Sequence, residues 1–486
     1  MANAQHFDVL IIGAGISGIS MACQLIRECP GKCFSILERR NAIGGTWDLF
    51  RYPGIRSDSD MMSLGFRFRP WTGRRVLPDG PSIRDYVNET AKAAGVDKHI
   101  QFGMRILSAD WSTAKGCWVV EALQEHSGEA RILTCNFLVS ATGYYDHDQG
   151  YLPNFPGIES YKGQCIHPQH WPESLDYRGK RVVVIGSGAT AVTLLPAMAN
   201  DTAHITMLQR SPSYVYSMPE VDKLATVLRR YLPDSWVYQL SRKRNILLQR
   251  TGYKFSRRFP RLTRWLLLAL VRKQLGPDFD MEHFTPRYMP WDERLCAVPN
   301  GDLFRVLREG KASVVTDHIE CFTESGILLK SGRELEADIV VTATGLRLQA
   351  LGGMKLSIDG IEQAVNQRMT YKGVLVQDIP NFAYLFGYTN IAWTLKIDMA
   401  AGFACRVLNE MSRRKLSIVT PRAPTGEIQA ESVFGSLQAG YVQRGGAFLP
   451  RQGRSGPWRV LNHFELDQVM YRRPVDESGL EWSREV

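Results

Sequence analysis

The feature that most constrains this chain is a motif sequence near its start that recurs further along. The first copy runs from Phe7 to Glu38, and its apolar run 9–12 is typical of a parallel strand buried on both faces. This run leads into G-x-G-x-x-G and a helical pattern, and a second apolar strand ends in Glu38, 20 residues after the third glycine. Strand, glycines, helix, strand and acid in this order predict a dinucleotide site.

Each residue type in the first copy has a physical reason. Gly13 allows the tight turn, Gly15 lets the backbone approach a pyrophosphate, and Gly18 lets helix and strand pack closely. The helix that begins here, with Ser17 in its first turn, offers amide donors and a positive dipole end to phosphate. Glu38 is the acceptor expected for a ribose hydroxyl. A glycine motif alone is often a tight turn, but the complete order of elements favours a binding site.

The second copy opens with an apolar strand at 180–185 and ends its second strand in Gln209-Arg210. Each copy is matched to a later strand that ends in Ala-Thr-Gly, at Gly143 and at Gly345. The residues predicted to form the second glycine loop are Gly186, Ser187, Gly188, Ala189, Thr190 and Ala191. This internal duplication predicts an α/β protein with two dinucleotide-binding units.

The two copies differ at the position that selects the nucleotide. Glu38 would repel a 2′-phosphate, whereas Arg210 would bind one through paired charge-assisted hydrogen bonds. Arg210 follows Ala191 by 19 residues, close to the spacing in the first copy. The first unit therefore suits FAD, and the second suits NADPH with Gln209 and Arg210 at its adenosine end. The alternative is that Arg210 is only a solvated surface residue.

Length and composition exclude several classes of protein. A chain of 486 residues is expected to form two or three domains. No signal peptide precedes the first strand, and the longest apolar run, 265–271, is too short to span a membrane, so we expect a cytoplasmic protein. Nine cysteines without C-x-x-C indicate reduced thiols and disfavour a disulfide-reducing flavoenzyme. We expect no metal site and no nucleic-acid partner.

Positive charge is concentrated in residues 221–275, which carry fourteen Lys and Arg against Asp222 and Asp234 in a chain of net charge +10. The simpler interpretation is a pair of helices that cap a cleft and leave a charged face in solvent. The alternative is peripheral contact with anionic membrane, which would place the protein at the inner face of the plasma membrane. The apolar positions concerned are Leu247, Leu248, Phe255, Phe259, Leu262, Trp265, Leu266 and Leu270.

Two further motifs have irregular, loop-like composition. Residues 44–58 are punctuated by Gly and Pro and predict loops near the nucleotide, although they could also be surface turns. Trp47 and the charged residues of this segment weaken the second interpretation, since loops on a rigid scaffold often carry function. Between the two units lies the spacing Gly-x3-His-x3-Trp-Pro, which spans 163–172.

Taken together, these motifs resemble the class B flavin monooxygenases, and specifically the type I Baeyer–Villiger monooxygenases. The fingerprint of that family, Phe-x-Gly-x3-His-x3-Trp-Pro/Asp, is matched at 161–172, with Tyr161 in place of Phe. The resemblance covers nearly the whole chain and is weakest in 420–486, whose role stays open, and in parts of the basic segment. Five segments resemble the mycobacterial ethionamide-activating subfamily, namely 50–61, 166–173, 207–212, 291–296 and 386–396.

The resemblance implies roles for individual residues. Arg294 matches the arginine that in this family sits over the flavin and stabilises the peroxide anion, and Asp58 matches the acid that positions it. Ile106 matches the strand residue whose backbone meets the adenine of FAD. On the sequence alone, an ordinary ion pair of Arg294 with Asp292, Glu293 or Asp58 would be the simpler interpretation. The loop residues expected to contact a cofactor are Gly45, Thr46, Trp47, Asp48, Leu49, Arg56, Ser57 and Asp58.

The implied architecture has two Rossmann-like domains and a helical insertion. We predict an FAD domain at 1–147 and 348–486, an NADPH domain at 148–218 and 296–347, and a basic helical insertion at 219–295.

The implied activity is monooxygenation with NADPH and O2 through a C4a-peroxyflavin. One oxygen of O2 would enter a ketone to give an ester or lactone, and sulfides or thioamides would also be oxygenated. One alternative is a flavin oxygenase limited to nitrogen and sulfur nucleophiles, which Trp171-Pro172 disfavours. Another is a protein that binds NADPH or senses redox state without turnover, which the intact motifs disfavour.

Overall fold

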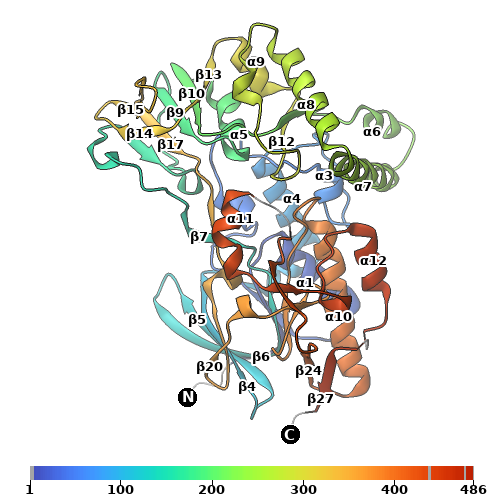
Figure 1. Cartoon of the computed structure of the whole chain (residues 1–486). Coiled ribbons are helices and arrows are strands. Elements are labelled where there is room, and N and C mark those ends of the chain that lie inside the picture. The colour runs from blue at the N-terminus through green and yellow to red at the C-terminus, as the bar shows by residue number, and fades with distance from the viewer. Residues whose placement is uncertain (1–4, 436–438, 476–477, 485–486) are drawn as a thin grey trace.

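The larger of two central sheets is mixed, and Figure 1 shows it in the lower half of the molecule. The computed structural model describes residues 5–435, 439–475 and 478–484. The main path of this sheet is β20 (Ile361–Glu362), β19 (Lys355–Ile358), β4 (Met104–Ser112), β5 (Cys117–Gln124), β6 (Glu129–Ser140), β1 (Gln5–Ile12), β2 (Phe34–Leu37) and β3 (Ile100–Gln101). Off this path, β23 (Phe382–Tyr384) pairs with β6, β22 (Leu375–Val376) pairs with β23, and β21 (Thr370–Tyr371) pairs with β22.

The smaller sheet is wholly parallel and repeats the centre of the larger one. Its order is β13 (Ala312–Thr316), β10 (His204–Gln209), β9 (Arg181–Ile185), β17 (Ile339–Thr342) and β8 (Gln164–Ile166). The parallel neighbours β17, β9 and β10 correspond to β6, β1 and β2 of the larger sheet. In both sheets the strand that ends in Ala-Thr-Gly therefore lies beside the strand that enters the glycine loop. The predicted duplication and the α/β class are confirmed.

Alternating side chains of the central strands fill the core on both faces of each sheet. In β1, Val9 and Ile11 join one buried cluster, whereas Leu10 and Ile12 join another. In β9, residues 182 and 184 face one cluster and 183 and 185 the other. Burial on both faces explains why the sequences of these strands are continuous apolar runs.

Helices cover these sheets and carry the sequence motifs. After β1 comes α1 (Ile16–Glu28), which packs on α10 (Thr394–Arg414) and α4 (Gly80–Ala93), and after β9 comes α5 (Ala189–Met198). Short helices are α2 (Thr46–Leu49), α3 (Met61–Leu64), α9 (Asp302–Arg308), α11 (Gly440–Gly445) and α12 (Phe464–Arg472). The small sheets are β11 (Val215–Met218) with β12 (Cys296–Pro299), β14 (Ile319–Phe322) with β15 (Gly326–Leu329) and β16 (Glu334–Glu336), β24 (Ile418–Pro421) with β27 (Leu480–Ser483), and β25 (Ile428–Ser432) with β26 (Arg451–Gly453).

The chain crosses between the two sheets at two places that lie side by side. It leaves the larger sheet through β7 (Tyr145–Gly150) and returns through β18 (Leu346–Leu348), and these strands pair antiparallel. The helix α11 packs on β18 and lies between the sheets in Figure 1. The C-terminal segment therefore reaches the junction of the two nucleotide units.

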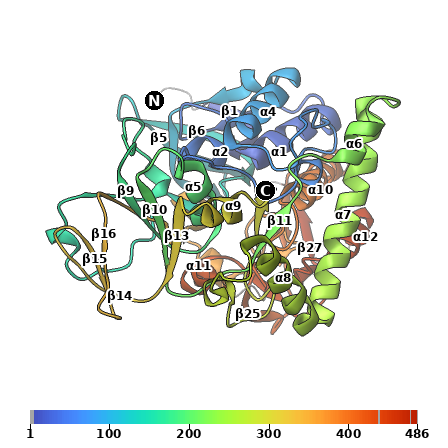
Figure 2. The ribbon, with the colours of Figure 1, turned by 90° about the horizontal axis from the view of Figure 1, so that it is seen from above.

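The basic segment is helical, but it faces the opposite way from our expectation. It forms α6 (Lys223–Leu228), α7 (Asp234–Arg258) and α8 (Pro260–Leu275), and α7 runs along one side of the molecule in Figure 2. The eight apolar side chains expected to cap a cleft are between 40% and 64% exposed, so that interpretation was wrong. We call this exposed set, which spans 247–270, the apolar face. In the described part of the chain, no helix is long and apolar enough to cross a membrane.

Candidate functional site

The first glycine loop is tightly packed against its surroundings. A β-carbon on Gly18 would overlap the carbonyl oxygen of Gly13, and one on Gly13 would lie 2.8 Å from the carbonyl oxygen of Ala141. The loop therefore needs glycine where helix, turn and the Ala-Thr-Gly ending meet. The N-cap of α1 is Gly15, and no side chain of the described residues caps it. Its amide donors and dipole are left for an anion.

Glu38 closes the base of this loop. It is buried, and its carboxylate accepts hydrogen bonds from the backbone amides of Ala14 at 2.6 Å and Arg40 at 2.8 Å. Burial raises the pKa of Glu38, while these two amides act in the opposite direction. The amide of Met104 donates to the carbonyl oxygen of Glu38 at 2.9 Å. The structure thus places Glu38 beside the start of β4, the strand that carries Ile106.

The predicted loop after the first unit folds back on the glycines. A β-carbon on Gly45 would lie only 3.0 Å from the Cα of Gly15, so the two loops touch. Thr46 and Trp47 begin α2, and both are partly buried, whereas Leu49 is buried. Residues 44–49 therefore cover the first glycine loop.

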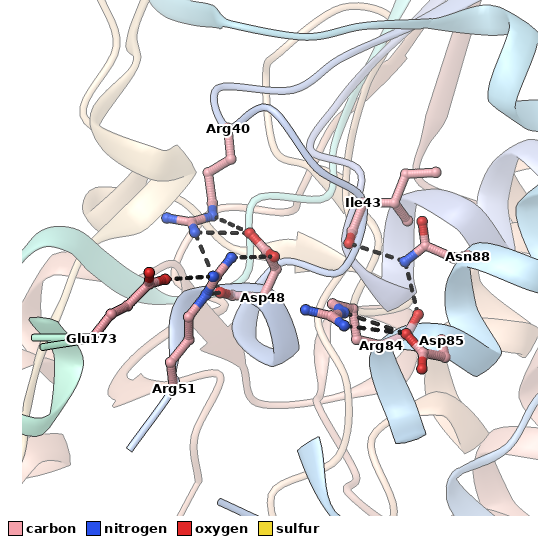
Figure 3. A network of polar contacts seen from close by, with 8 residues as sticks. All are labelled: Arg40, Ile43, Asp48, Arg51, Arg84, Asp85, Asn88 and Glu173. Atoms are coloured by element: carbon pink, nitrogen blue, oxygen red, sulfur yellow. Dashed lines mark hydrogen bonds and ion pairs between the residues drawn. The ribbon is translucent and has the colours of Figure 1, made fainter. Parts of the chain in front are cut away.

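Arginine pairs fix this covering segment, as Figure 3 shows. The buried carboxylate of Asp48 pairs with Arg40 at 2.7 Å and with Arg51 at 3.1 Å. Arg51 also pairs with Glu173 at 3.0 Å, which joins the covering segment to the residue that follows Trp171-Pro172. The charge of Asp48 is therefore engaged in holding the two segments together.

The next residues bridge to the second unit. Arg56 forms a 2.6 Å ion pair with Asp302 at the start of α9, and Tyr52 is buried in the same apolar cluster as Leu194 of α5. Burial raises the pKa of Tyr52 to about 12, so its hydroxyl stays protonated. Ser57 is buried, and its hydroxyl donates to the carbonyl oxygen of Ser59 at 2.7 Å. These contacts hold the segment 50–57 between the two sheets.

The second glycine loop is more open than the first. A β-carbon on Gly186 would overlap the carbonyl oxygen of Ala343, as the duplication predicts, but one on Gly188 meets nothing within 4 Å. Ala189 is exposed, and Ala191, which replaces the third glycine, is buried. Ser187 donates to the carbonyl oxygen of residue 211 at 2.9 Å. No described side chain caps the N-terminus of α5, so its amides are also available to an anion.

Only one of the two predicted selectivity residues is available to a ligand. Gln209 is buried, and its amide nitrogen donates to the carbonyl oxygen of His283 at 2.8 Å and to Thr316 at 2.9 Å. Arg210 is exposed and has no ion pair within 4.0 Å among the residues described. Gln209 is therefore engaged in contacts within the protein, whereas the exposed guanidinium of Arg210 is available to a ligand.

Arg294 is partly buried and has no counter-ion at contact distance. Its Nε atom is buried without a hydrogen-bond partner, and within the described ranges no ion pair reaches it. Asp58 is exposed and acts on Arg294 only at longer range, so the direct pair that the resemblance implied is not formed. Asp292 pairs instead with Arg257 at 2.7 Å. The pKa of Arg294 lies well above its ordinary value, chiefly through the neighbouring oxygen of Tyr441.

The surroundings of Arg294 include residues that the sequence motifs did not identify. Tyr144 and Tyr145 follow the first Ala-Thr-Gly ending, and their hydroxyls lie 2.7 Å apart. The hydroxyl of Tyr441 is buried and has no partner in the described part of the chain. Tyr144 and Tyr145 could have been found in the sequence, because they directly follow Gly143 at the end of the first Ala-Thr-Gly strand. Tyr441 lies in the segment with the weakest resemblance, where no motif marked it.

Comparison with known proteins identifies the family. Residues 78–380 match the family model described as flavin-binding monooxygenase-like. The chain belongs to this family. Residues 11–70 match an NAD(P)-binding Rossmann-like domain, which is the region of the first glycine loop.

Relatives of similar length match over almost the whole chain. It is 56% identical over 484 residues to the putative FAD-containing monooxygenase MymA of Mycobacterium tuberculosis, covering 99% of this chain and 98% of the relative. It is 51% identical over 483 residues to the FAD-containing monooxygenase EthA of the same species, again covering 99% and 98%. The family resemblance read from the motifs is confirmed.

Solved structures with the same fold are more distant in sequence. An oxidised steroid monooxygenase bound to NADP superposes with a TM-score of 0.80 at 20% identity and covers 99% of this chain and 100% of its own. An ε-caprolactone-bound cyclohexanone monooxygenase gives a TM-score of 0.76 at 19% identity, with the same coverage. These likenesses establish a shared fold.

Proposed function

We propose that this protein uses FAD and NADPH to insert one oxygen of O2 into ketones, giving esters or lactones, and that it also oxygenates sulfides or thioamides. The family and the FAD-containing relatives support the flavin chemistry. The cyclohexanone monooxygenase of the same fold was solved with a lactone, which supports the ester-forming reaction. The observation that carries the proposal is Arg294, a partly buried cation whose Nε has no partner in the described residues.

The first unit fits FAD. The uncapped start of α1 suits a pyrophosphate, and buried Glu38 suits a ribose hydroxyl in a unit that the segment 44–49 covers. We assign the FAD domain to 1–147 and 348–486. The residues proposed to hold FAD are Gly13, Gly15, Ser17, Gly18, Glu38, Gly45, Thr46, Trp47, Asp48, Leu49 and Ile106.

The second unit fits NADPH. The uncapped start of α5, the open space at Gly188 and the exposed Arg210 suit a phosphorylated nucleotide that enters from solvent. We assign this domain to 148–218 and 296–347, with the insertion at 219–295 between its parts. The residues proposed to contact the coenzyme are Arg56, Ser57, Asp58, Gly186, Ser187, Gly188, Ala189, Thr190, Ala191 and Arg210, with buried Gln209 supporting the strand end beside Arg210.

Bound FAD supplies hydride acceptance from NADPH and the subsequent reaction with O2. Arg294 supplies a fixed positive charge that stabilises negative charge developing during oxygen transfer, and a guanidinium does not deprotonate to escape this role. The hydroxyls of Tyr144, Tyr145 and Tyr441 act electrostatically on the cation, and its partial burial strengthens its field. Asp58 acts from longer range and helps to orient the guanidinium.

A coupled assay with cyclohexanone and a thioether tests this function. The purified flavoprotein should oxidise NADPH in step with lactone formation from the ketone and sulfoxide formation from the thioether. Sulfoxide without lactone would restrict the enzyme to soft nucleophiles. Binding of NADPH with no substrate-dependent oxidation across a ketone and sulfide panel would leave a redox-binding protein.

We also propose that the apolar face contacts an anionic membrane surface. The polar side of α7 and α8 anchors the helices to the protein: Arg242 donates to the carbonyl oxygens of residues 62, 63 and 65, and Arg264 donates to that of Pro286 at 2.5 Å. With Arg242 and Arg264 turned inward, the pair presents its apolar residues to solvent. Such a face gains affinity from a bilayer interface.

Charge at the rim of the apolar face fits anionic lipid. Six exposed cations there form no ion pair within the residues described, and each would be attracted to a negative headgroup surface. They are Lys243, Lys254, Arg258, Arg261, Arg272 and Lys273. The same arrangement links the membrane to the site, because Arg257 of α7 pairs with Asp292, two residues before Arg294.

Sedimentation with phosphatidylglycerol vesicles at low salt tests the contact. The protein should sediment, and the double variant Leu248→Ser, Trp265→Ser should remain in solution. Ile361→Ser on β20, which is 70% exposed, is the matched control and should sediment normally. Failure of the unaltered protein to sediment would exclude the contact. Loss of self-association in the double variant would assign the face to a second copy instead.

A further inference from the structure

The six-residue helix α11 brings a second arginine to the junction of the two units. The guanidinium carbon of Arg444 lies 3.6 Å above the centre of the Tyr151 ring. Its Nη2 atom lies 3.4 Å from the position that a β-carbon on Gly345 would occupy. Stacking on an aromatic ring and contact with backbone fix the direction of the side chain while leaving the residue exposed.

The backbone beside Arg444 belongs to the turn that packs against the second glycine loop. Gly345 ends the turn that begins at Thr342, and the carbonyl oxygen of Ala343 in this turn touches Gly186. The carbonyl oxygen of Gly345 accepts a hydrogen bond from the amide of Tyr151 at 3.0 Å. Arg444 is therefore held two residues from the point where the turn meets the predicted phosphate loop.

Two arginines at this place lack a partner of opposite charge. Neither Arg210 nor Arg444 forms an ion pair within 4.0 Å in the described ranges. Partial burial lowers the pKa of Arg444, the hydroxyl of Tyr151 raises it, and the positive charge of Arg210 lowers it again. Glu293 acts on Arg210 only at longer range, and burial raises the pKa of this carboxyl. An anion bound near both arginines would relieve the repulsion.

We propose that Arg444 is a second phosphate-binding residue for the coenzyme and acts with Arg210. This inference rests on the proposed function and adds a residue from the C-terminal segment, outside the smaller sheet, to the NADPH site. The shared chemistry is a phosphate, which could be the 2′-phosphate or the pyrophosphate.

The position of Arg444 also links coenzyme binding to Arg294. Tyr441 and Arg444 are three residues apart on α11, so they share one side of the helix. Tyr441 acts on Arg294, while Arg444 faces the end of the second unit. A phosphate held by Arg444 would therefore fix the helix that places Tyr441 beside Arg294.

Binding of NADP+ and NAD+ to the oxidised FAD-loaded protein tests this proposal without turnover. Arg444→Ala should weaken NADP+ roughly tenfold to a hundredfold, and Arg444→Lys should restore part of the loss. A loss for NADP+ alone identifies the 2′-phosphate, and an equal loss for NAD+ identifies the pyrophosphate. Arg459→Ala, an exposed arginine of the same segment, is the control and should bind both normally.

The outcomes separate this inference from the proposed function. Unchanged dissociation constants for both nucleotides in Arg444→Ala would overturn the role of Arg444 and leave the NADPH site intact. Failure of the unaltered holoprotein to bind NADP+ would overturn both. An equal fall in thermal stability and in binding for Arg444→Ala and Arg459→Ala would indicate a general structural effect and contradict the assignment.

Discussion

The glycine loop of the larger sheet is enclosed, whereas that of the smaller sheet opens to solvent. Gly15 lies against Gly45 in the first, and no atom lies within 4 Å of a β-carbon placed on Gly188 in the second. The selecting residues differ in the same sense: Glu38 is buried and hydrogen-bonded, and Arg210 is exposed and free of ion pairs among the described residues.

This difference matches the two tasks that the proposed reaction sets. A cofactor that stays bound gains from burial and from a covering segment, because dissociation then requires that segment to open. A coenzyme that must leave after each cycle needs an open loop, and a charged contact at the surface supplies selectivity without enclosure. One copy of the duplicated unit can therefore retain its nucleotide while the other exchanges it, because different segments pack around the two glycine loops.

The largest expected effect comes from reversing charge in the enclosed unit. Glu38→Arg removes the buried acceptor and places a long cation where the nucleotide is proposed to lie, so the variant should purify without flavin. Glu362→Arg on exposed β20 is the control and should keep its colour. The flavin-to-protein absorbance ratio measures both. A fully loaded Glu38→Arg protein would break the assignment of the first unit.

Arg294 separates nucleotide binding from oxygen transfer. Arg294→Ala should retain FAD and still oxidise NADPH, but lose about 2.7–4 kcal/mol of transition-state stabilisation, on the order of a hundredfold to a thousandfold in product formation. Lysine should rescue only part of this, and Asp58→Ala should show a milder defect. Parallel measurement of NADPH, H2O2 and ester decides the matter. Full coupling in Arg294→Ala would reduce this residue to a structural role.

The open unit should discriminate through Arg210. Arg210→Ala should weaken NADPH by about 1.5–3 kcal/mol, roughly one to two decades in affinity, and change NADH much less. Titration of the reductive half-reaction with each coenzyme gives the ratio. An equal change for both coenzymes would show that selectivity lies elsewhere.

Exchange of the third glycine position tests the packing difference itself. Gly18→Ala would force its β-carbon into the carbonyl of Gly13 and should cost about 1–3 kcal/mol, whereas Ala191→Gly should cost only about 1 kcal/mol. Urea unfolding monitored by far-UV circular dichroism compares the two. Similar costs at both positions would mean that the loops are packed alike.

The sequence predicted those parts of the molecule that depend on local order along the chain. Strand, glycine turn and helix lie within about thirty residues in each unit, and the glycines meet the backbone contacts that their spacing implies. Glu38 lies directly after β2 as its spacing from the glycines implies, and its carbonyl oxygen accepts a hydrogen bond from the first residue of β4, the strand that carries Ile106.

What the sequence could not predict depends on distant segments. Arg444 and Tyr441 reach the junction of the two units through the packing of α11 on β18, a contact between segments far apart in the chain. The inward turn of Arg242 and Arg264 depends on carbonyl groups of other segments, so helical periodicity did not show that the apolar face points outward. The separation of Asp58 and Arg294 is likewise set by two loops on different parts of the chain.

Dialysis of the purified protein loaded with both nucleotides tests the division between retention and exchange most directly. After extensive dialysis, about one FAD per chain should remain while NADP+ is lost, and NADP+ added back should bind without displacing flavin. Loss of FAD as readily as NADP+, or displacement of FAD by NADP+, would contradict the account, because both nucleotides would then occupy equivalent or shared sites.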